Sequence, residues 1–201
     1  MLPFFPAFQK DELLYSAVAR YHRMAGWRCW SAALEALFGR RYVVASHDLP
    51  GHLGALCERL ASGGSGSSAV LACIERWTLL PYYTSAASPA IREAAMSAAV
   101  NGGGSSHLSL GLAVSCVPRV AALRFCPRCK AEDMADLGFT WWRRSHQLPG
   151  TLVCVRHGVS LCETPFSFGR MGRHEFLIAD DRSCPTLARP LADDSTACLD
   201  V

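Results

Sequence analysis

Apolar residues recur at helical spacing in the first part of the chain. In residues 11–25, leucine, valine, alanine and tyrosine side chains fall on one stripe, two acidic residues lead the stripe and Gly26 follows it. This pattern predicts an amphipathic helix. Shorter helices are predicted over residues 31–38 and 50–60. Three short helices in about fifty residues are compatible with a helix-turn-helix, although three packed helices also form many other small cores.

Glycine and serine interrupt the rest of the pattern twice. Residues 62–68 and 101–106 are rich in these residue types and predict flexible connections. Alanine-rich helices are predicted over residues 69–80 and 89–100. The apolar segment 108–117 fits either a helix or a buried strand.

The composition indicates a folded protein. Half of the 201 residues are hydrophobic and 18% are charged, so the chain can bury a core and is not wholly disordered. No apolar run reaches the length of a membrane span, and no basic leader precedes an apolar stretch at the N-terminus. We therefore expect a cytoplasmic protein without a membrane partner. Its ten cysteines are then better explained as thiols or metal ligands than as a disulfide framework.

Positive charge is carried almost entirely by arginine and is concentrated in one part of the chain. Lys10 and Lys130 are the only lysines among twenty basic residues. This bias suits bidentate contacts to phosphate or carboxylate, but it also follows from an arginine-rich genome. Residues 119–157 contain seven basic and three acidic residues, so this stretch is expected to carry most of the basic surface.

The strongest chemical signal is a pair of short cysteine motifs. Cys126-Pro-Arg-Cys129 is followed after twenty-four residues by Cys154-Val-Arg-His157. Three thiolates and an imidazole at this spacing predict one structural Zn²⁺ ion in a closed tetrahedral site, with no open position for catalysis. Two alternatives are a thioredoxin-like redox dithiol at Cys126 and Cys129 and four unrelated residues. The second motif argues against the redox alternative.

The loop between the two motifs combines aromatic and basic residues. A bound metal would hold rigid a segment that contains Trp141, Trp142, Arg143, Arg144 and His146, a mixture that suits nucleic-acid backbone or an acidic protein surface. Alternatively, the tryptophans fill a small core beside the metal and the arginines form a solvated rim. The candidates for nucleic-acid contact are Arg40, Arg41, Arg124, Arg128, Arg143, Arg144 and His146.

Three common catalytic motifs are missing from the sequence. A P-loop needs a lysine directly after a glycine, and neither lysine follows one. A zinc deaminase needs His-X-Glu, whereas His174 and Glu175 are adjacent. The run of glycine and serine over residues 63–67 lacks the last glycine of a nucleophile elbow. We therefore predict that the protein is not an enzyme.

Together these features predict a mainly α-helical fold with little β structure. A helix-turn-helix-like region is expected over residues 1–61, a helical segment over 62–118 and a zinc-finger or zinc-ribbon module over 119–162. Periodicity fades from Val159, so residues 163–201 are expected to be irregular, and partly disordered or truncated.

Several blocks of the chain resemble the TniQ/TnsD family of transposon target-selection proteins. The resemblance covers most of residues 3–178 and is carried, in order, by DELLYSAVARYH, LFGRRYVVASHDLPGHLGAL, WTLLPYY, LRFCPRCKAED and WWRRSHQLPGTLVCVRHGVSL. It implies a helix-turn-helix-like region at the N-terminus. It also implies a zinc finger held by Cys126, Cys129, Cys154 and His157.

The resemblance also implies a function. Such proteins recognise a target site, or a guide complex already on it, and recruit the AAA+ ATPase that licenses the transposase. We therefore expect an adaptor in DNA transposition, associated with the bacterial nucleoid and able to form a homodimer. Its partners would be the ATPase, contacted through the N-terminal helices, and DNA or a DNA-bound targeting complex. The alternative is a self-contained, zinc-containing protein that binds DNA sequence-specifically.

This chain departs from many relatives near its C-terminus. They have a second cysteine-pair module or a long C-terminal DNA-binding region, whereas Cys162, Cys184 and Cys198 form no pair here. Site-specific DNA recognition is therefore the part of the family pattern that these residues support least.

Overall fold

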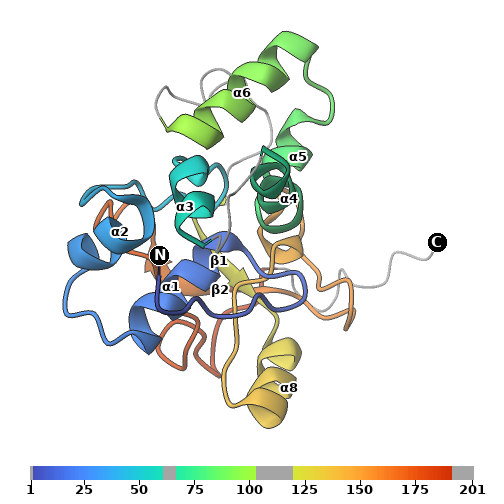
Figure 1. Cartoon of the computed structure of the whole chain (residues 1–201). Coiled ribbons are helices and arrows are strands. Elements are labelled where there is room, and N and C mark those ends of the chain that lie inside the picture. Colours follow the sequence, from blue (N-terminus) through green and yellow to red (C-terminus); the bar gives the residue numbers. More distant parts are fainter. Residues whose placement is uncertain (1, 61–66, 103–119, 192–201) are drawn as a thin grey trace.

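The structure is a computed structural model that describes residues 2–60, 67–102 and 120–191. Six helices come first: α1 (Leu14–Met24), α2 (Trp30–Phe38), α3 (Leu53–Leu60), α4 (Ser67–Trp77), α5 (Leu80–Thr84) and α6 (Pro89–Asn101). Strand β1 (Ala122–Phe125), helix α8 (Pro127–Leu137), the 3₁₀ helix η2 (Ser145–Gln147) and strand β2 (Cys162–Ser167) follow. Helices α6 and α8 lie at opposite ends of the molecule (Figure 1). The described residues are thus mainly helical, which confirms the predicted fold class.

The first three helices match the sequence pattern closely, but the connection between the second and third is long. Helix α2 ends at Gly39, whose φ of +68° suits glycine and whose N–H donates to the Glu35 carbonyl at 2.9 Å. Residues 39–52 then lead to α3. A helix-turn-helix turn has only three or four residues, so this segment is a surface loop of its own, and it carries Arg40 and Arg41.

The predicted helix over residues 69–80 is divided into α4 and α5. The Thr78 hydroxyl donates to the Ile74 carbonyl at 2.7 Å and accepts from the Leu80 N–H at 3.2 Å. This side chain ends α4 and starts the next turn. Pro81 in the first turn of α5 lacks an N–H and disfavours helical backbone at the residue before it. The WTLLPYY block therefore forms a corner between two helices.

The prediction of irregular structure from residue 163 is wrong for β2. This strand pairs with β1 in an antiparallel sheet, with Phe125 opposite Cys162 and Arg124 opposite Glu163. Neither strand has the clean alternation of a longer one, and β2 contains Pro165. The pairing of segments distant in sequence supplied a strand that the local pattern did not indicate.

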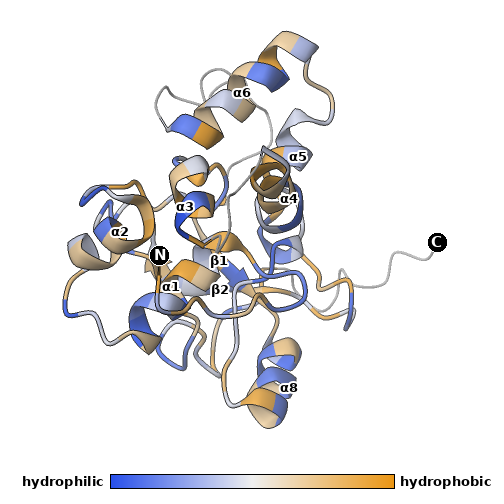
Figure 2. Ribbon diagram, in the orientation of Figure 1, coloured by the Kyte–Doolittle hydropathy of each residue, from blue (hydrophilic) through white to orange (hydrophobic). Residues whose placement is uncertain are grey.

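One hydrophobic core joins the N-terminal helices to the C-terminal half. Residues of α1 to α4 share it with Leu123, Phe125, Trp142, Phe176 and Cys184. Figure 2 shows hydrophobic residues on α1 near the centre of the molecule. The acids that lead α1 also contribute: Glu12 is fully buried and pairs with Arg20 at 2.8 Å. The predicted segments at 1–61 and 119–162 are therefore packed directly on one another.

Some predictions lie outside the described residues. They concern the apolar segment 108–117, most of both glycine-serine stretches, and the acidic end of the chain with Cys198. In the part of the chain that the structure describes, no helix is long and apolar enough to span a membrane.

Candidate metal centre

The first cysteine motif sits where β1 passes into α8. Cys126 is the N-cap residue of α8 in an extended conformation, and its sulfur accepts a hydrogen bond from the Cys129 N–H at 3.5 Å. Pro127 occupies the first turn, where its missing N–H has no cost. One turn of helix therefore brings the sulfur atoms of Cys126 and Cys129 to the same side of its N-terminus.

The second motif is a tight turn closed by backbone hydrogen bonds. The N–H groups of His157 and Gly158 both donate to the Cys154 carbonyl, at 3.3 and 2.8 Å, and the Cys154 N–H donates to the Val159 carbonyl at 2.8 Å. Gly158 has a φ of +64°, which a residue with a Cβ adopts only with strain. This turn directs the side chains of Cys154 and His157 to one point.

The four side chains meet at distances that fit a tetrahedral metal ion. Their candidate ligand atoms lie within 4.8 Å of one another. Nδ1 of His157 is 3.5, 3.3 and 3.7 Å from the sulfurs of Cys126, Cys129 and Cys154. The sulfurs of Cys129 and Cys154 are 3.7 Å apart. Zn–S and Zn–N bonds at tetrahedral angles require about 3.8 Å between two sulfurs and about 3.6 Å between sulfur and nitrogen.

The chemistry of the cluster also suits a metal cation. The three cysteines are each 1% exposed, and buried thiols without a cation favour the protonated form. A hydrogen bond from the Cys129 thiol, the largest effect, lowers the pKa of Cys126 to about 4, and the same bond together with burial raises the pKa of Cys129. A metal ion would convert this shared-proton arrangement into a set of thiolate ligands.

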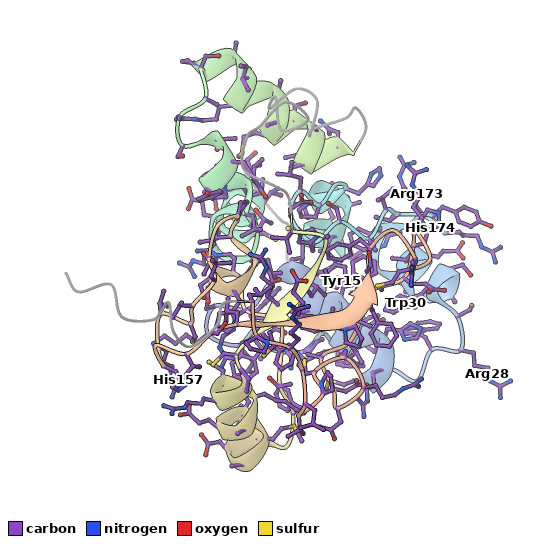
Figure 3. All side chains as sticks on the ribbon, turned by 180° about the vertical axis from the view of Figure 1, so that it is seen from behind. Tyr15, Arg28, Trp30, His157, Arg173 and His174 are labelled. Carbon is purple, nitrogen blue, oxygen red and sulfur yellow. The ribbon has the colours of Figure 1, made fainter. Side chains whose placement is uncertain are left out.

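Glu132 holds the imidazole of His157 from the side away from the sulfurs. Its Oε1 lies 2.9 Å from Nε2 of His157, while Arg156 pairs with its Oε2 at 2.7 Å. Figure 3 shows His157 next to α8. A carboxylate on one nitrogen leaves the other free to bind metal. The motif reading missed Glu132, although its position three residues after Cys129 on a helix placed it on the same face.

The expectation that Arg143 and His146 face nucleic acid is wrong in its geometry. Arg143 is 8% exposed and His146 is 3% exposed. The Arg143 guanidinium makes two hydrogen bonds to Asp133, at 2.7 and 2.8 Å, and lies 4.3 Å from the centroid of the Trp141 ring. Burial, the largest effect, and Arg143 together lower the pKa of His146 to about 4. Both side chains are structural parts of the interior.

The two tryptophans of the same loop belong to the core, as the simpler explanation predicted. Trp142 is fully buried. Its N–H accepts no solvent but donates to the Ser16 hydroxyl at 3.1 Å, and its ring N–H donates to the Leu177 carbonyl at 2.7 Å. The Leu13 N–H donates to the Trp142 carbonyl at 3.0 Å. This residue thus ties the metal-ligand segment to α1 and to the C-terminal part of the chain.

Two further arginines of the predicted set are also engaged inside the protein. Arg144 donates to the carbonyls of Glu75 and Thr78 at the end of α4. Its positive charge there complements the helix dipole. Arg124 is 11% exposed, donates to the Thr151 carbonyl at 3.0 Å and pairs with Glu163 at 3.5 Å. Neither guanidinium is free to bind an external anion without giving up these contacts.

The remaining candidates are exposed. Arg128 lies on the first turn of α8, and Arg40 and Arg41 lie in the loop after α2. The structure therefore does not bring the seven predicted residues together. It separates four arginines and a histidine of the metal-ligand region from Arg40 and Arg41 on the N-terminal helices.

Comparisons with known proteins give a consistent result. The family model TniQ matches residues 3–161, a range that includes the N-terminal helices and all four cluster residues. "Transposon Tn7 transposition protein TnsD" of Escherichia coli is 34% identical over 155 residues, which cover 77% of this chain. The chain spans about 30% of that relative's length.

Proposed function

Because the chain belongs to the TniQ family, we propose that it is an adaptor that selects targets for a transposon. In this proposal it links target DNA, or a targeting complex already on DNA, to an AAA+ regulator of transposition. The observation that carries the proposal is the match of the TniQ model over residues 3–161. The name of its Tn7 relative, a transposition protein, supports the same process.

Zn²⁺ is the metal that fits the cluster best. Three sulfurs and one imidazole nitrogen are its preferred structural ligands, and the four occupy every position of a tetrahedron. Such an ion would cross-link the start of α8 to the turn at residues 154–157. Because the segment between them carries Trp142, the ion would also support the packing of that segment on α1.

The metal proposal is tested by elemental analysis and chelation. We expect one Zn²⁺ per chain, and on chelation we expect hydrogen exchange to rise first in residues 124–160. A purified protein without zinc, in which Cys126 and Cys129 cycle reversibly through a disulfide, would instead support the redox alternative.

The adaptor proposal is tested with the cognate ATPase. We expect the purified chain to capture the ATPase in a pull-down, with the N-terminal helices as the contact. Binding to target DNA is measured beside it, and gel filtration reports whether the chain is a homodimer. A folded, zinc-loaded chain that ignores the ATPase and binds one DNA sequence tightly would favour the self-contained DNA-binding protein.

A further inference from the structure

Two segments far apart in sequence form one exposed basic surface. The surface consists of Arg40, Arg41 and Tyr42 from the loop after α2, and Arg173 and His174 from the segment after β2; we call it the loop surface. Figure 3 shows Arg173 and His174 next to each other at the outside of the molecule, on the same side as Arg28.

Backbone contacts fix the two segments to each other. The Ala45 N–H donates to the Arg173 carbonyl at 3.0 Å, and Nδ1 of His174 lies 2.9 Å from the Val43 carbonyl. Val43 is 3% exposed and anchors the loop, while its neighbour Tyr42 is 71% exposed. The rings of Tyr42 and His174 lie 5.5 Å apart. The fold therefore holds this surface in place and presents its aromatic ring outward.

The charge of the loop surface is largely uncompensated. Arg40, Arg41 and Arg173 are all exposed. Within the described residues, only Arg41 has a carboxylate at ion-pair distance, namely Glu35 at 3.9 Å, and both of its side chains are about 60% exposed. Such a solvated pair contributes little and exchanges easily for another anion. Glu175 is the other acid near this region, and it is turned toward Gly172.

We infer that the loop surface is where this protein contacts the phosphate backbone of DNA. The inference rests on the proposed function and supplies it with a DNA-binding site. Guanidinium groups bind phosphate bidentately, and an exposed tyrosine ring packs against a sugar or an unstacked base. Protein–protein interfaces have a core depleted in charge, whereas DNA interfaces are polar and strongly positive. Three arginines around one tyrosine match DNA.

The surface carries no feature that reads base identity. Its guanidinium groups lie on loops, and no helix of the described residues projects from it. Contacts to phosphate position a protein on DNA without distinguishing sequences. We therefore expect binding that is almost independent of sequence and strongly dependent on salt.

The test compares two triple variants of the full chain. In the first, Arg40→Ala, Arg41→Ala and Arg173→Ala remove the charge of the loop surface. In the matched control, Arg76→Ala, Arg182→Ala and Arg189→Ala remove the same charge from exposed positions elsewhere. Zinc content and circular dichroism confirm that both are folded. Binding to a labelled DNA duplex of arbitrary sequence is measured by fluorescence anisotropy at several salt concentrations.

The expected result is a change in the salt dependence of the first variant alone. Each lost phosphate contact lowers the log–log slope by about 0.9, so three lower it by about 2.7, which is about a 40-fold smaller loss of affinity between about 50 and 200 mM salt. The control keeps the slope of the wild type. Affinity at low salt falls in the first variant for every duplex alike.

Each other outcome overturns the inference in a different way. If the first variant and the control bind DNA as the wild type does, the loop surface is not the contact, and the proposed function stands. If DNA binding is unchanged but capture of the ATPase is lost in the first variant, the surface binds protein. If the wild type captures the ATPase and binds no DNA, the surface is refuted and the adaptor function survives. If it does neither, both proposals fail.

Discussion

The ion pair between Asp133 and Arg143 gives the sharpest test of the structure. The two side chains are 5% and 10% exposed and are joined by hydrogen bonds of 2.7 and 2.8 Å. The Thr140 hydroxyl donates a third hydrogen bond to Asp133 at 2.8 Å. The pair connects α8 to the segment that carries Trp142. If Arg143 were on the surface, as the sequence suggested, none of these contacts would matter for folding.

Asp133→Asn removes the negative charge and keeps the shape of the side chain. The guanidinium of Arg143 then stays buried without a counter-ion, which destabilises a protein by about 3 to 5 kcal/mol. For a chain of this size, each kcal/mol lowers Tm by about 2 to 4 °C, so we expect a decrease of about 10 °C. A carboxylate at the surface would instead contribute less than about 1 kcal/mol.

The assay is urea unfolding followed by circular dichroism, with zinc content measured for each protein. Asp136→Asn is the matched control, because Asp136 is an exposed residue of the same helix, and we expect its unfolding free energy to stay within about 0.5 kcal/mol of the wild type. If Asp133→Asn is as stable as this control, the pair is not buried and the reasoning fails. The same holds if Arg143→Ala weakens DNA binding and leaves stability unchanged.

Three further predictions follow from single residues. Glu132→Gln should weaken metal binding by about 10- to 100-fold in a chelator competition, because the carboxylate that orients the imidazole of His157 is lost; equal affinities would contradict this role. Gly39→Ala should lower the unfolding free energy by about 1 to 2 kcal/mol, because φ is +68° and the added Cβ would lie 2.5 Å from Arg59; an unchanged urea midpoint would refute it. For His146, burial lowers the pKa from 6.5 in the unfolded chain to about 4. The unfolded state then binds a proton first as pH falls below 6.5, so stability is full above this pH and is lost toward pH 4. Between about pH 7 and pH 5 this costs about 2 kcal/mol, and His146→Gln should show a correspondingly smaller pH dependence in urea unfolding.

Much of the candidate site followed from the sequence, because its determinants are local. Cys126 and Cys129 are separated by one helical turn, and Cys154 and His157 by one closed turn, so each pair is positioned by its own backbone. Ligand chemistry then selects the four without reference to the rest of the fold. The ends of α1 and α2 were likewise encoded by apolar spacing and by Gly39.

Exposure could not be read in the same way. Trp142, Arg143 and His146 stand beside one another in sequence, and a charged, aromatic loop fits either a surface or an interior. Their burial depends on partners supplied by distant segments. Ser16 lies 126 residues from Trp142, and the carboxylate that neutralises Arg143 belongs to the neighbouring helix.

The sequence by itself determined the helical content, the family blocks and the metal-ligand quartet. The tertiary structure alone decided which arginines face solvent. Tyr42 and His174 come together through a hydrogen bond between residues 131 positions apart, while Arg143 and Arg144 are drawn inward by Asp133 and by the end of α4. The physical reason is that the charge of an arginine is fixed by its chemistry, whereas its solvation is fixed by whatever the folded chain packs against it.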